Sequence, residues 1–483
     1  MEALTASAIR RADRTSAAIV AAMLLSVGGI GGSLVLIGQA SADDASWSPY
    51  PSMMLPRAWP ETVVLPDGDI LVVGGVSISG PTASTEVFDV DEESWKPGPA
   101  MAEKRVGHTV TLLDDGTVLV AGGETGSGVT DSAEIIDVDH GACYSLPDMS
   151  FSRSGHAAVR LQESGVLVTG GTDWSSGVWS QAEMYDPDSH SWSPAGTMAH
   201  ARVFLSMQLL ESGKAIAIGG DDEGTSELYD PATGEWHGEA SMLASRRHSA
   251  SVVTSSGSVL VAGGVGSGEA LASSEMYDSN AGIWLPAGDM NAPRAHFTMS
   301  LIPDGRVLAA GSWMNGEGSL KAAELFCQCT MTWNPTTAMI EARGAHGAAE
   351  LPNGHLLMIG GRDGDVIIAS TEEYTPPTTG PEPPPLPPPP YCQPKDILPF
   401  ILAVAPQMPG SSYNGLVAKV LVAQVYYEEG LIEDCLHILD AFYNEIRAFL
   451  LNGHVDEEGS SSLYLAYASV VECLGGAPLP EIP

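Results

Sequence analysis

Basic residues are scarce in this chain of 483 residues, where 21 lysines and arginines stand against 60 aspartates and glutamates, a formal net charge of −39. A surface that binds nucleic acid needs clustered lysine and arginine to neutralise phosphates. The shortage therefore excludes nucleic acid as a partner. The simplest use of so much negative charge is to keep the protein soluble.

Cysteine is also scarce, with six residues in the chain. Cys327 and Cys329 lack the spacing of a zinc knuckle or of a thioredoxin-type redox pair. We expect structural cysteines, no metal site and no cofactor. Cys435 and Cys473 lie in the same tail region and are expected to form a disulfide if the protein is exported.

One long hydrophobic run is present, at residues 17–38, which contain no charged residue. Arg10, Arg11 and Arg14 precede it, and the small residues 40–42 that follow are typical of a signal-peptidase site. We expect residues 1–42 to be a signal peptide, with the mature chain beginning at Asp43. The run is long enough to span a bilayer, so an uncleaved membrane anchor is the alternative. Either reading predicts a secreted, periplasmic or cell-surface protein.

A unit of about 48 residues is repeated seven times along the chain. An apolar run ends in each copy at a pair of small residues, seventeen residues after an arginine. The pairs begin at Gly74, Gly122, Gly170, Gly219, Gly263, Gly311 and Gly360, and the arginines are Arg57, Arg105, Arg153, Arg202, Arg246, Arg294 and Arg343. The glycine pair is complete in six copies, whereas Ser312 replaces the second glycine in one.

A glutamate follows each pair and begins a short segment that is mostly Glu-x-aromatic-Asp. These residues are Glu86, Glu134, Glu183, Glu227, Glu275, Glu324 and Glu372. A tryptophan stands nine residues later in most copies, whereas Cys143 takes that place in the second. Each copy contains two apolar segments separated by a turn and two further strand-like segments. Four antiparallel strands with both faces covered are typical of a propeller blade.

The pattern of glycine pair, Glu-x-Tyr-Asp and tryptophan resembles the kelch repeat over residues 43–375. The resemblance implies an all-β, seven-bladed kelch propeller. The seventh copy lacks its own tryptophan strand, but Trp47, Met53 and Arg57 have the spacing of the other tryptophan, methionine and arginine columns. We therefore expect the N-terminal segment to supply the outermost strand of the last blade, which removes an open edge.

A separate small module is expected at the C-terminus. Residues 376–394 form a proline-rich linker, whose polyproline tract is stiff and extended. Beyond it, residues 395–483 contain three apolar stripes with helical spacing, which predict an all-α, three-helix domain. This tail resembles a small helical domain of secreted microbial proteins, and that resemblance implies no activity.

The repeated arginines and glutamates are structural candidates, because a catalytic site needs one constellation and not seven. Histidines follow five of the arginines, two residues later at His248 and His296 and three residues later at His108, His156 and His346. Strand alternation points the two groups to opposite faces, which predicts packing roles and not a ring of metal ligands.

The resemblance leaves an enzyme open, although no catalytic residue can be assigned. A kelch-type sugar epimerase or mutarotase is one alternative to a binding protein. A copper radical oxidase similar to galactose oxidase is another. It would require a tyrosine cross-linked to cysteine, a second tyrosine and two histidines near the axis. We expect a non-enzymatic binding protein whose partner is a glycan or an extracellular protein.

The loops after the second strand of each copy are the only place where copy length varies, so that face is free to specialise. Tryptophans stand there beside carboxylates, a combination that suits stacking on a sugar and accepting its hydroxyl hydrogens. The candidate ligand-binding residues are Trp174, Trp179, Trp313, Asp173, Asp221, Asp222, Glu223, Glu317, Asp363 and Asp365.

Overall fold

The computed structural model describes residues 45–162, 165–279, 281–314, 318–328 and 330–377. The expected signal segment, the helical module, nearly all of the linker, Glu317 and the Cys435–Cys473 pair lie outside these residues. Within them, no helix has the length and apolar character needed to cross a membrane.

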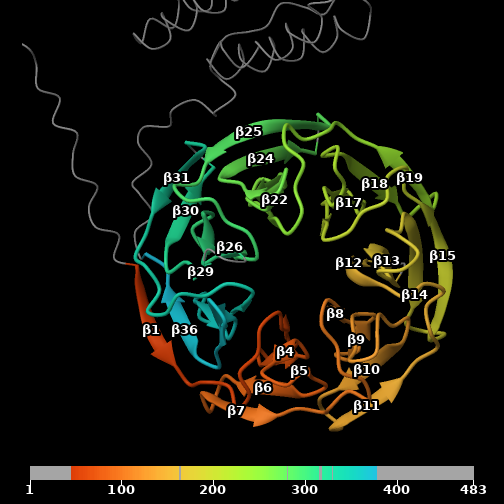
Figure 1. The fold of residues 1–483 in the computed structure, drawn as a ribbon, viewed down its shortest axis with the longest axis horizontal. Coiled ribbons are helices and arrows are strands. Elements are labelled where there is room, and N and C mark those ends of the chain that lie inside the picture. Colours follow the sequence, from red (N-terminus) through yellow and green to blue (C-terminus); the bar gives the residue numbers. More distant parts are fainter. Residues whose placement is uncertain (1–44, 163–164, 280, 315–317, 329, 378–483) are drawn as a thin grey trace, which may run out of the picture. The chain divides into compact units, whose positions relative to one another are not determined.

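Seven four-stranded antiparallel sheets surround a central axis (Figure 1). The inner strand of each blade, in chain order, is β2 Glu61–Val64, β8 Thr109–Leu112, β12 Ser154–Leu161, β16 Ser206–Leu209, β20 Ala250–Val253, β26 Thr298–Leu301 or β32 Gly347–Glu350. The second strands are β3 Ile70–Val73, β9 Val118–Ala121, β13 Gly165–Thr172, β17 Ala215–Ile218, β21 Val259–Ala262, β27 Val307–Ala310 and β33 Leu356–Ile359.

The third strands carry the repeated glutamates. They are β6 Thr85–Asp89, β10 Ala133–Asp137, β14 Gln181–Asp186, β18 Ser226–Asp230, β24 Ser273–Asp278, β30 Ala323–Cys327 and β36 Thr371–Thr375. The outermost strands are β7 Ser94–Pro97, β11 Ala142–Ser145, β15 Ser191–Thr197, β19 Glu235–Gly238, β25 Ile283–Asp289, β31 Thr332–Pro335 and β1 Ser46–Tyr50. Four blades add a two-stranded hairpin after the second strand: β4 Val76–Ser77 with β5 Gly80–Pro81, β22 Val265–Gly266 with β23 Glu269–Ala270, β28 Trp313–Met314 with β29 Gly318–Ser319, and β34 Arg362–Asp363 with β35 Val366–Ile367.

The N-terminal strand closes the ring. β1 pairs antiparallel with β36, and Trp47 lies opposite Tyr374 in this register. Their ring centroids are 4.9 Å apart. The indole Nε1 of Trp47 also donates to the carbonyl of Thr337 in the preceding blade at 2.7 Å. The seven-bladed architecture and the closure predicted from the sequence are both confirmed.

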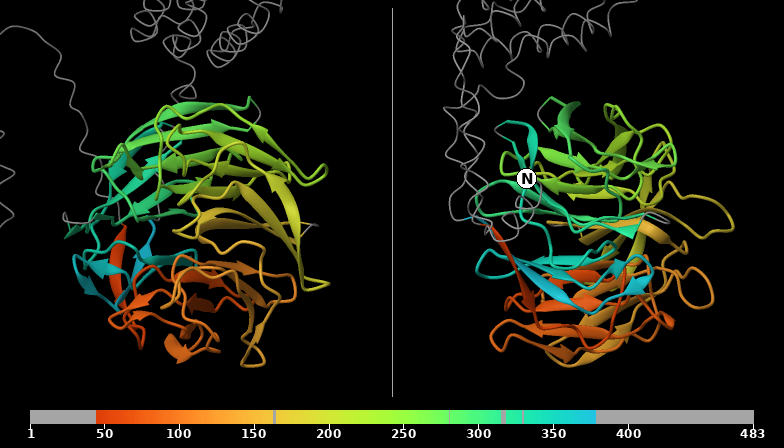
Figure 2. Two further views of the ribbon diagram at one scale, coloured as in Figure 1. Left: turned by 45° about the vertical axis from the view of Figure 1, so that its right-hand side comes forward. Right: turned by 60° about the vertical axis from the view of Figure 1, so that its left-hand side comes forward.

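The core lies between neighbouring sheets, which pack face to face around the ring (Figure 2). The second strands are apolar on both faces because a sheet covers each face; β3, β9 and β21 are buried along their whole length. Burying this apolar surface is the main favourable contribution to folding. The hairpins, by contrast, were not predicted, because they fall in the variable part of each copy.

Each repeated arginine is fully buried and anchors the connection between two blades. The guanidinium of Arg57 donates to the carbonyls of Gly74 and Ser84 and lies 2.7 Å from the Glu86 carboxylate. Glu86 in turn accepts from the backbone N–H groups of Met54 and Leu55, in the segment that arrives from the seventh blade. The predicted structural role of these columns is confirmed.

The glycine pair exists because the next blade approaches it closely. Gly74 and Gly75 have φ angles of 60° and 89°, which an L side chain rarely adopts. The Gly75 N–H donates to the carbonyl of Arg105 in the next blade at 2.9 Å. A methyl group built on Gly74 would stand 2.6 Å from the His108 ring. The pair is therefore required by packing between blades.

Candidate ligand-binding site

One residue from each blade forms a ring at the mouth of the central axis. These residues stand two positions after the repeated arginines, and all have positive φ: Trp59, Gly107, Gly155, Phe204, His248, His296 and Ala345. Six successive N–H to C=O hydrogen bonds connect them around the ring, including Phe204 to Gly155 at 2.7 Å and Ala345 to His296 at 2.7 Å. Backbone hydrogen bonds therefore hold the ring together, while its side chains range from glycine to tryptophan.

The large members of this ring make a continuous row with two further tryptophans, Trp174 from the loop after β13 and Trp313 from the hairpin strand β28. We call this row the aromatic arc: Trp174, Phe204, His248, His296, Trp59 and Trp313. The rings of Phe204 and His248 are stacked at 3.9 Å, and those of His248 and His296 lie 4.0 Å apart. Trp174 continues the row beyond Phe204 at 6.0 Å. At the other end, the rings of Trp59 and Trp313 meet the His296 ring edge-on, with centroid distances of 6.0 Å and 5.5 Å.

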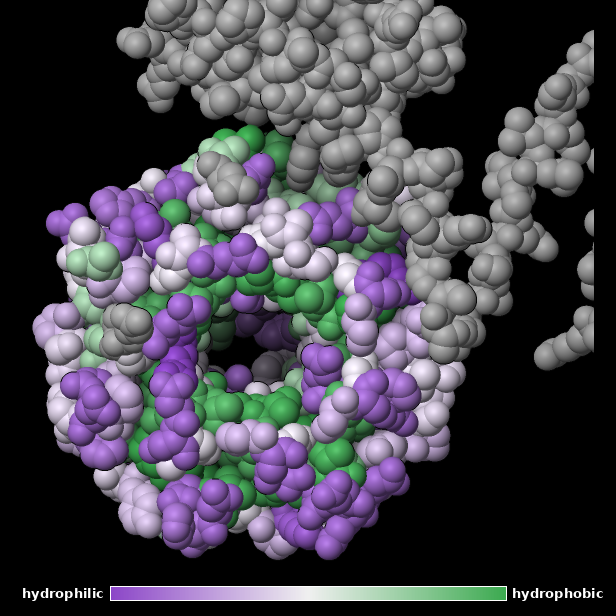
Figure 3. Space-filling view, turned by 180° about the vertical axis from the view of Figure 1, so that it is seen from behind, coloured by the Kyte–Doolittle hydropathy of each residue, from purple (hydrophilic) through white to green (hydrophobic). Residues whose placement is uncertain are grey.

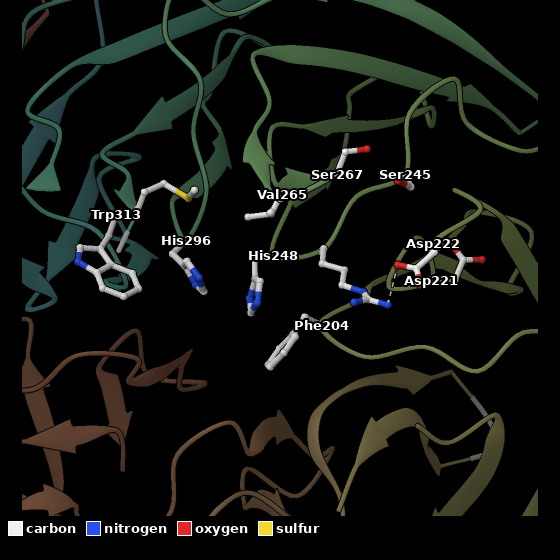
Figure 4. Close-up of a pocket in the computed structure, with 12 residues that line it drawn as sticks. Phe204, Asp221, Asp222, Ser245, His248, Val265, Ser267, His296 and Trp313 are labelled. Atoms are coloured by element: carbon white, nitrogen blue, oxygen red, sulfur yellow. Dashed lines mark ion pairs between the residues drawn. The ribbon is translucent and has the colours of Figure 1, made fainter. Parts of the chain in front are cut away.

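Two cavities open against the aromatic arc. The axial cavity, of about 780 Å³, follows the inner strands and is lined by Trp59, Trp174, Phe204 and the ring histidines. The side pocket, of about 460 Å³, lies between the fourth, fifth and sixth blades. Figure 4 shows Trp313, His296, His248 and Phe204 in a row along this pocket, with Asp221 and Asp222 at its far end. Seen from behind, the central opening is surrounded mainly by apolar residues and rimmed by polar ones (Figure 3).

The ring histidines are neutral at physiological pH. Burial, with smaller effects of His296 and Arg247, lowers the pKa of His248 to about 3. Burial also lowers the pKa of His296 to about 4. Neutral imidazoles can stack closely without repulsion, and each ring keeps one donor and one acceptor nitrogen. The aromatic arc thus offers flat apolar faces together with hydrogen-bonding atoms.

The structure brings four of the sequence-predicted residues to these cavities. Trp174 is 57% exposed and lines the axial cavity, whereas Trp313, Asp221 and Asp222 line the side pocket. The Asp221 carboxylate is buried and accepts from the N–H groups of its own loop. Asp222 is exposed and pairs with Arg247 at 3.1 Å. Asp222 is therefore the more accessible of the two carboxylates, and Arg247 balances its charge.

Five other predicted residues line neither cavity. The Trp179 indole donates to the Ser152 carbonyl and packs on Phe151. The Asp173 carboxylate accepts from two backbone N–H groups of its own turn. The last three lie in loops or hairpins. Glu223 pairs with His200 and Asp365 with Arg362, whereas Asp363 forms no ion pair within the described chain.

Phe204, His248, His296 and Trp59 are the site residues that sequence reasoning did not select. The histidines were noted only as packing residues, on the argument that alternation separates them from His108, His156 and His346. That separation holds only in part: His108, His156 and His346 are buried, and His156 meets Thr109 of the preceding blade at 3.0 Å. All five histidines nevertheless line the axial cavity, so the expectation of opposite faces was wrong. The missed signal was the column two residues after each arginine, which varies from glycine to tryptophan in an otherwise strict repeat.

The described residues do not assemble the copper site considered above. No group of three or more histidine, cysteine, aspartate or glutamate side chains among them could hold a metal ion. Every described tyrosine lies on a third or outermost strand, away from the axial ring. Cys143 also lies on an outermost strand, where its thiol donates to Glu134 and has its pKa raised to about 12, chiefly by burial.

The blades share an end at which the variable loops meet the connections between blades. Isolated bridges pair Ala58 with Val76 and Arg247 with Val265, so both loop types open on one face, as the sequence predicted. This is the face that carries the aromatic arc.

Comparison with known proteins agrees with this architecture. A family model described as Kelch motif matches residues 62–102 and 246–291. No curated protein sequence matches the chain significantly. Among solved structures, the chain is similar to a fungal alcohol oxidase described as having catalytic diversity among the AA5 family and in complex with copper. That similarity has a TM-score of 0.56 and 18% sequence identity, and it covers 70% of this chain and 77% of the other. Identity at this level shows the fold alone. The chain is a seven-bladed β-propeller that carries kelch motifs.

Proposed function

We propose that this propeller is an exported binding protein whose ligand is a carbohydrate held against the aromatic arc. The observation that supports this most is the concentration of aromatic rings at the axial mouth of a chain with only 6% aromatic residues. Flat rings stack on the C–H faces of sugars, and a few polar groups fix orientation. Neutral imidazoles and the exposed Asp222 are such groups.

An extracellular protein is the second class of partner, since an exposed aromatic residue such as Trp174 is also typical of protein interfaces. Fold alone does not decide between them. A glycan array and a pull-down from extracellular material, both with the whole protein, would separate the two classes.

The binding test compares two exposed aromatic residues. Trp174→Ala removes a ring from the aromatic arc, whereas Tyr144→Ala removes one of similar exposure, 54% against 57%, from the outermost strand β11. We expect Trp174→Ala to weaken glycan binding about tenfold, within the roughly 1–3 kcal/mol that one aromatic ring contributes to stacking with a nucleic-acid base. Tyr144→Ala should leave binding unchanged. Equal binding by both variants would place the ligand elsewhere.

The enzymatic alternatives remain a sugar epimerase or mutarotase and a copper oxidase. The solved relative with copper gives the second a structural precedent. The described residues do not fit a copper centre. Product analysis after incubation with each sugar that binds would reveal an epimerase.

Export is proposed from the sequence of residues 1–42. If the segment is cleaved, the intact mass of the protein recovered from its native host should match a chain that begins at Asp43. A chain that retains the segment and partitions with membranes would favour the anchor.

A further inference from the structure

The axial cavity is lined by negative and neutral side chains only. Its lining includes Glu61 and Glu124, and no lysine or arginine is among the residues that form it. Five histidines also line it, at positions 108, 156, 248, 296 and 346. Burial lowers the pKa of each to between about 3 and about 4, so none carries a proton at neutral pH.

Glu61 interrupts a hydrogen-bonding pattern of the inner strands. In the second blade, Thr109 meets His156 of the next blade at 3.0 Å, and in the sixth blade Thr298 meets His346 at 2.9 Å. Glu61 occupies the same position in the first blade, four residues after its arginine, and the next blade presents His108.

No such bond forms at this junction. Within the described chain, no hydrogen bond or ion pair joins the Glu61 carboxylate to another group, and burial alone raises its pKa to about 7. Glu61 is half-buried as a residue and lines the axial cavity. A carboxylate so enclosed is costly unless a partner compensates it.

The cations at the rim do not supply that partner. Arg247 lines the neighbouring side pocket and pairs with Asp222 at 3.1 Å. Arg362 lies over the Trp313 ring at 4.4 Å and pairs with Asp365 at 3.3 Å. Each rim arginine is thus matched by a carboxylate of its own, and no lysine or arginine lines the axial cavity.

We propose that the axial cavity binds an amino sugar, whose ammonium group bonds to Glu61 while its ring stacks on the aromatic arc. An ammonium group donates charge-assisted hydrogen bonds to a carboxylate and is attracted to aromatic faces. A uronic acid, by contrast, meets the carboxyl groups of Glu61 and Glu124 and no lysine or arginine. This inference rests on the proposed carbohydrate function and names its ligand class.

The test uses three oligosaccharides of equal length with the whole protein: glucosamine oligomers, their N-acetylated forms and oligouronates. We expect the glucosamine oligomers to bind at least tenfold more tightly than the N-acetylated forms, and the oligouronates not to bind. Glu61→Gln keeps the size of the side chain and should abolish that preference. Glu269→Gln removes the same charge from the exposed hairpin strand β23 and should retain it.

Four results would overturn the inference. N-acetylated oligomers that bind as tightly as the amines would do so, as would bound oligouronates. A Glu61→Gln protein that unfolds at the wild-type temperature and keeps the preference would remove Glu61 from the site. In each of these three cases, the proposed carbohydrate-binding function would still be supported if glycan binding depends on Trp174. If no glycan binds at all, both the inference and the proposed function fail.

Discussion

At the scale of single residues, the repeat is maintained by contacts that cross from one blade to the next. Gly74 has little space because the His108 ring and the Arg105 carbonyl of the next blade press on it. Gly80, in the hairpin of the same blade, also has positive φ, but nothing lies within 4 Å of its Cβ position. Substitutions at Gly80 and Gly74 can therefore distinguish the cost of backbone strain from the cost of contact between blades.

Replacing each of them with alanine should therefore give different losses of stability. Gly80→Ala costs the left-handed conformation alone, about 1–2 kcal/mol. Gly74→Ala adds overpacking against the next blade, roughly a further 1–3 kcal/mol. Urea denaturation measures both. Equal free energies of unfolding for the two variants would contradict the close approach at Gly74.

At the scale of elements, the seventh blade is assembled from both ends of the described chain. Five residue pairs join β1 to β36, and Met53 beyond β1 is buried in the adjoining core. Residues 46–56 therefore belong to the folded unit, although the sequence separates them from the rest of the blade by some 300 residues.

A variant that lacks residues 46–56 should melt several degrees below the wild type, because an edge of β36 and part of a core become exposed. Differential scanning calorimetry checks this. Trp47→Ala, which removes one ring of the closure, should give a smaller decrease. An unchanged melting temperature in the deletion would contradict closure by β1.

The sequence predicts the strands and the blades more completely than it predicts the residues of the candidate site. Residues such as Arg105, Gly122 and Glu134 have equivalents at nearly fixed spacing in the other copies. One copy therefore predicts the blade, and the repetition predicts how the ring closes. The aromatic arc depends on contacts between blades. Phe204 and His248 are 44 residues apart in sequence and stack only because neighbouring blades bring equivalent positions together. No local pattern contains that contact.

At the scale of the whole molecule, buried histidines determine the response to mild acid. The pKa of His108, His156 and His346 is lowered to about 3, mainly by burial. Because the unfolded chain binds their protons near pH 6.5 and the folded chain does not, stability falls as the pH decreases below 6.5. Each contributes up to about 1.4 kcal/mol per pH unit in that window.

Glu61 acts in the opposite direction, since its raised pKa makes the folded state bind a proton between pH 7 and 4.5. One carboxyl group does not offset these three histidines together with His248 and His296, whose pKa values are also lowered. The lowered pKa values of Glu134 and Glu324 matter only below about pH 4.5. We therefore expect the free energy of unfolding to decrease from pH 6.5 to 5.

Urea denaturation across this range checks the expectation. His156→Gln should reduce the slope, because one of the titrating groups is removed while a side chain that can still bond to Thr109 remains. Stability that rises as the pH falls from 6.5 to 5 would contradict the assignment of neutral buried histidines.

The ring at the axial mouth also restricts how this protein can have diverged. A methyl group on Gly155 would lie 2.6 Å from the Phe204 ring, so the phenyl ring of one blade occupies the space of a side chain in the preceding blade. Gly107 is limited in the same way by Ser154. Changes of size at the mouth must therefore occur in adjacent blades together. Homologues with a larger residue in place of Gly155 should carry a smaller one in place of Phe204, so that new ligand specificities arise through paired substitutions.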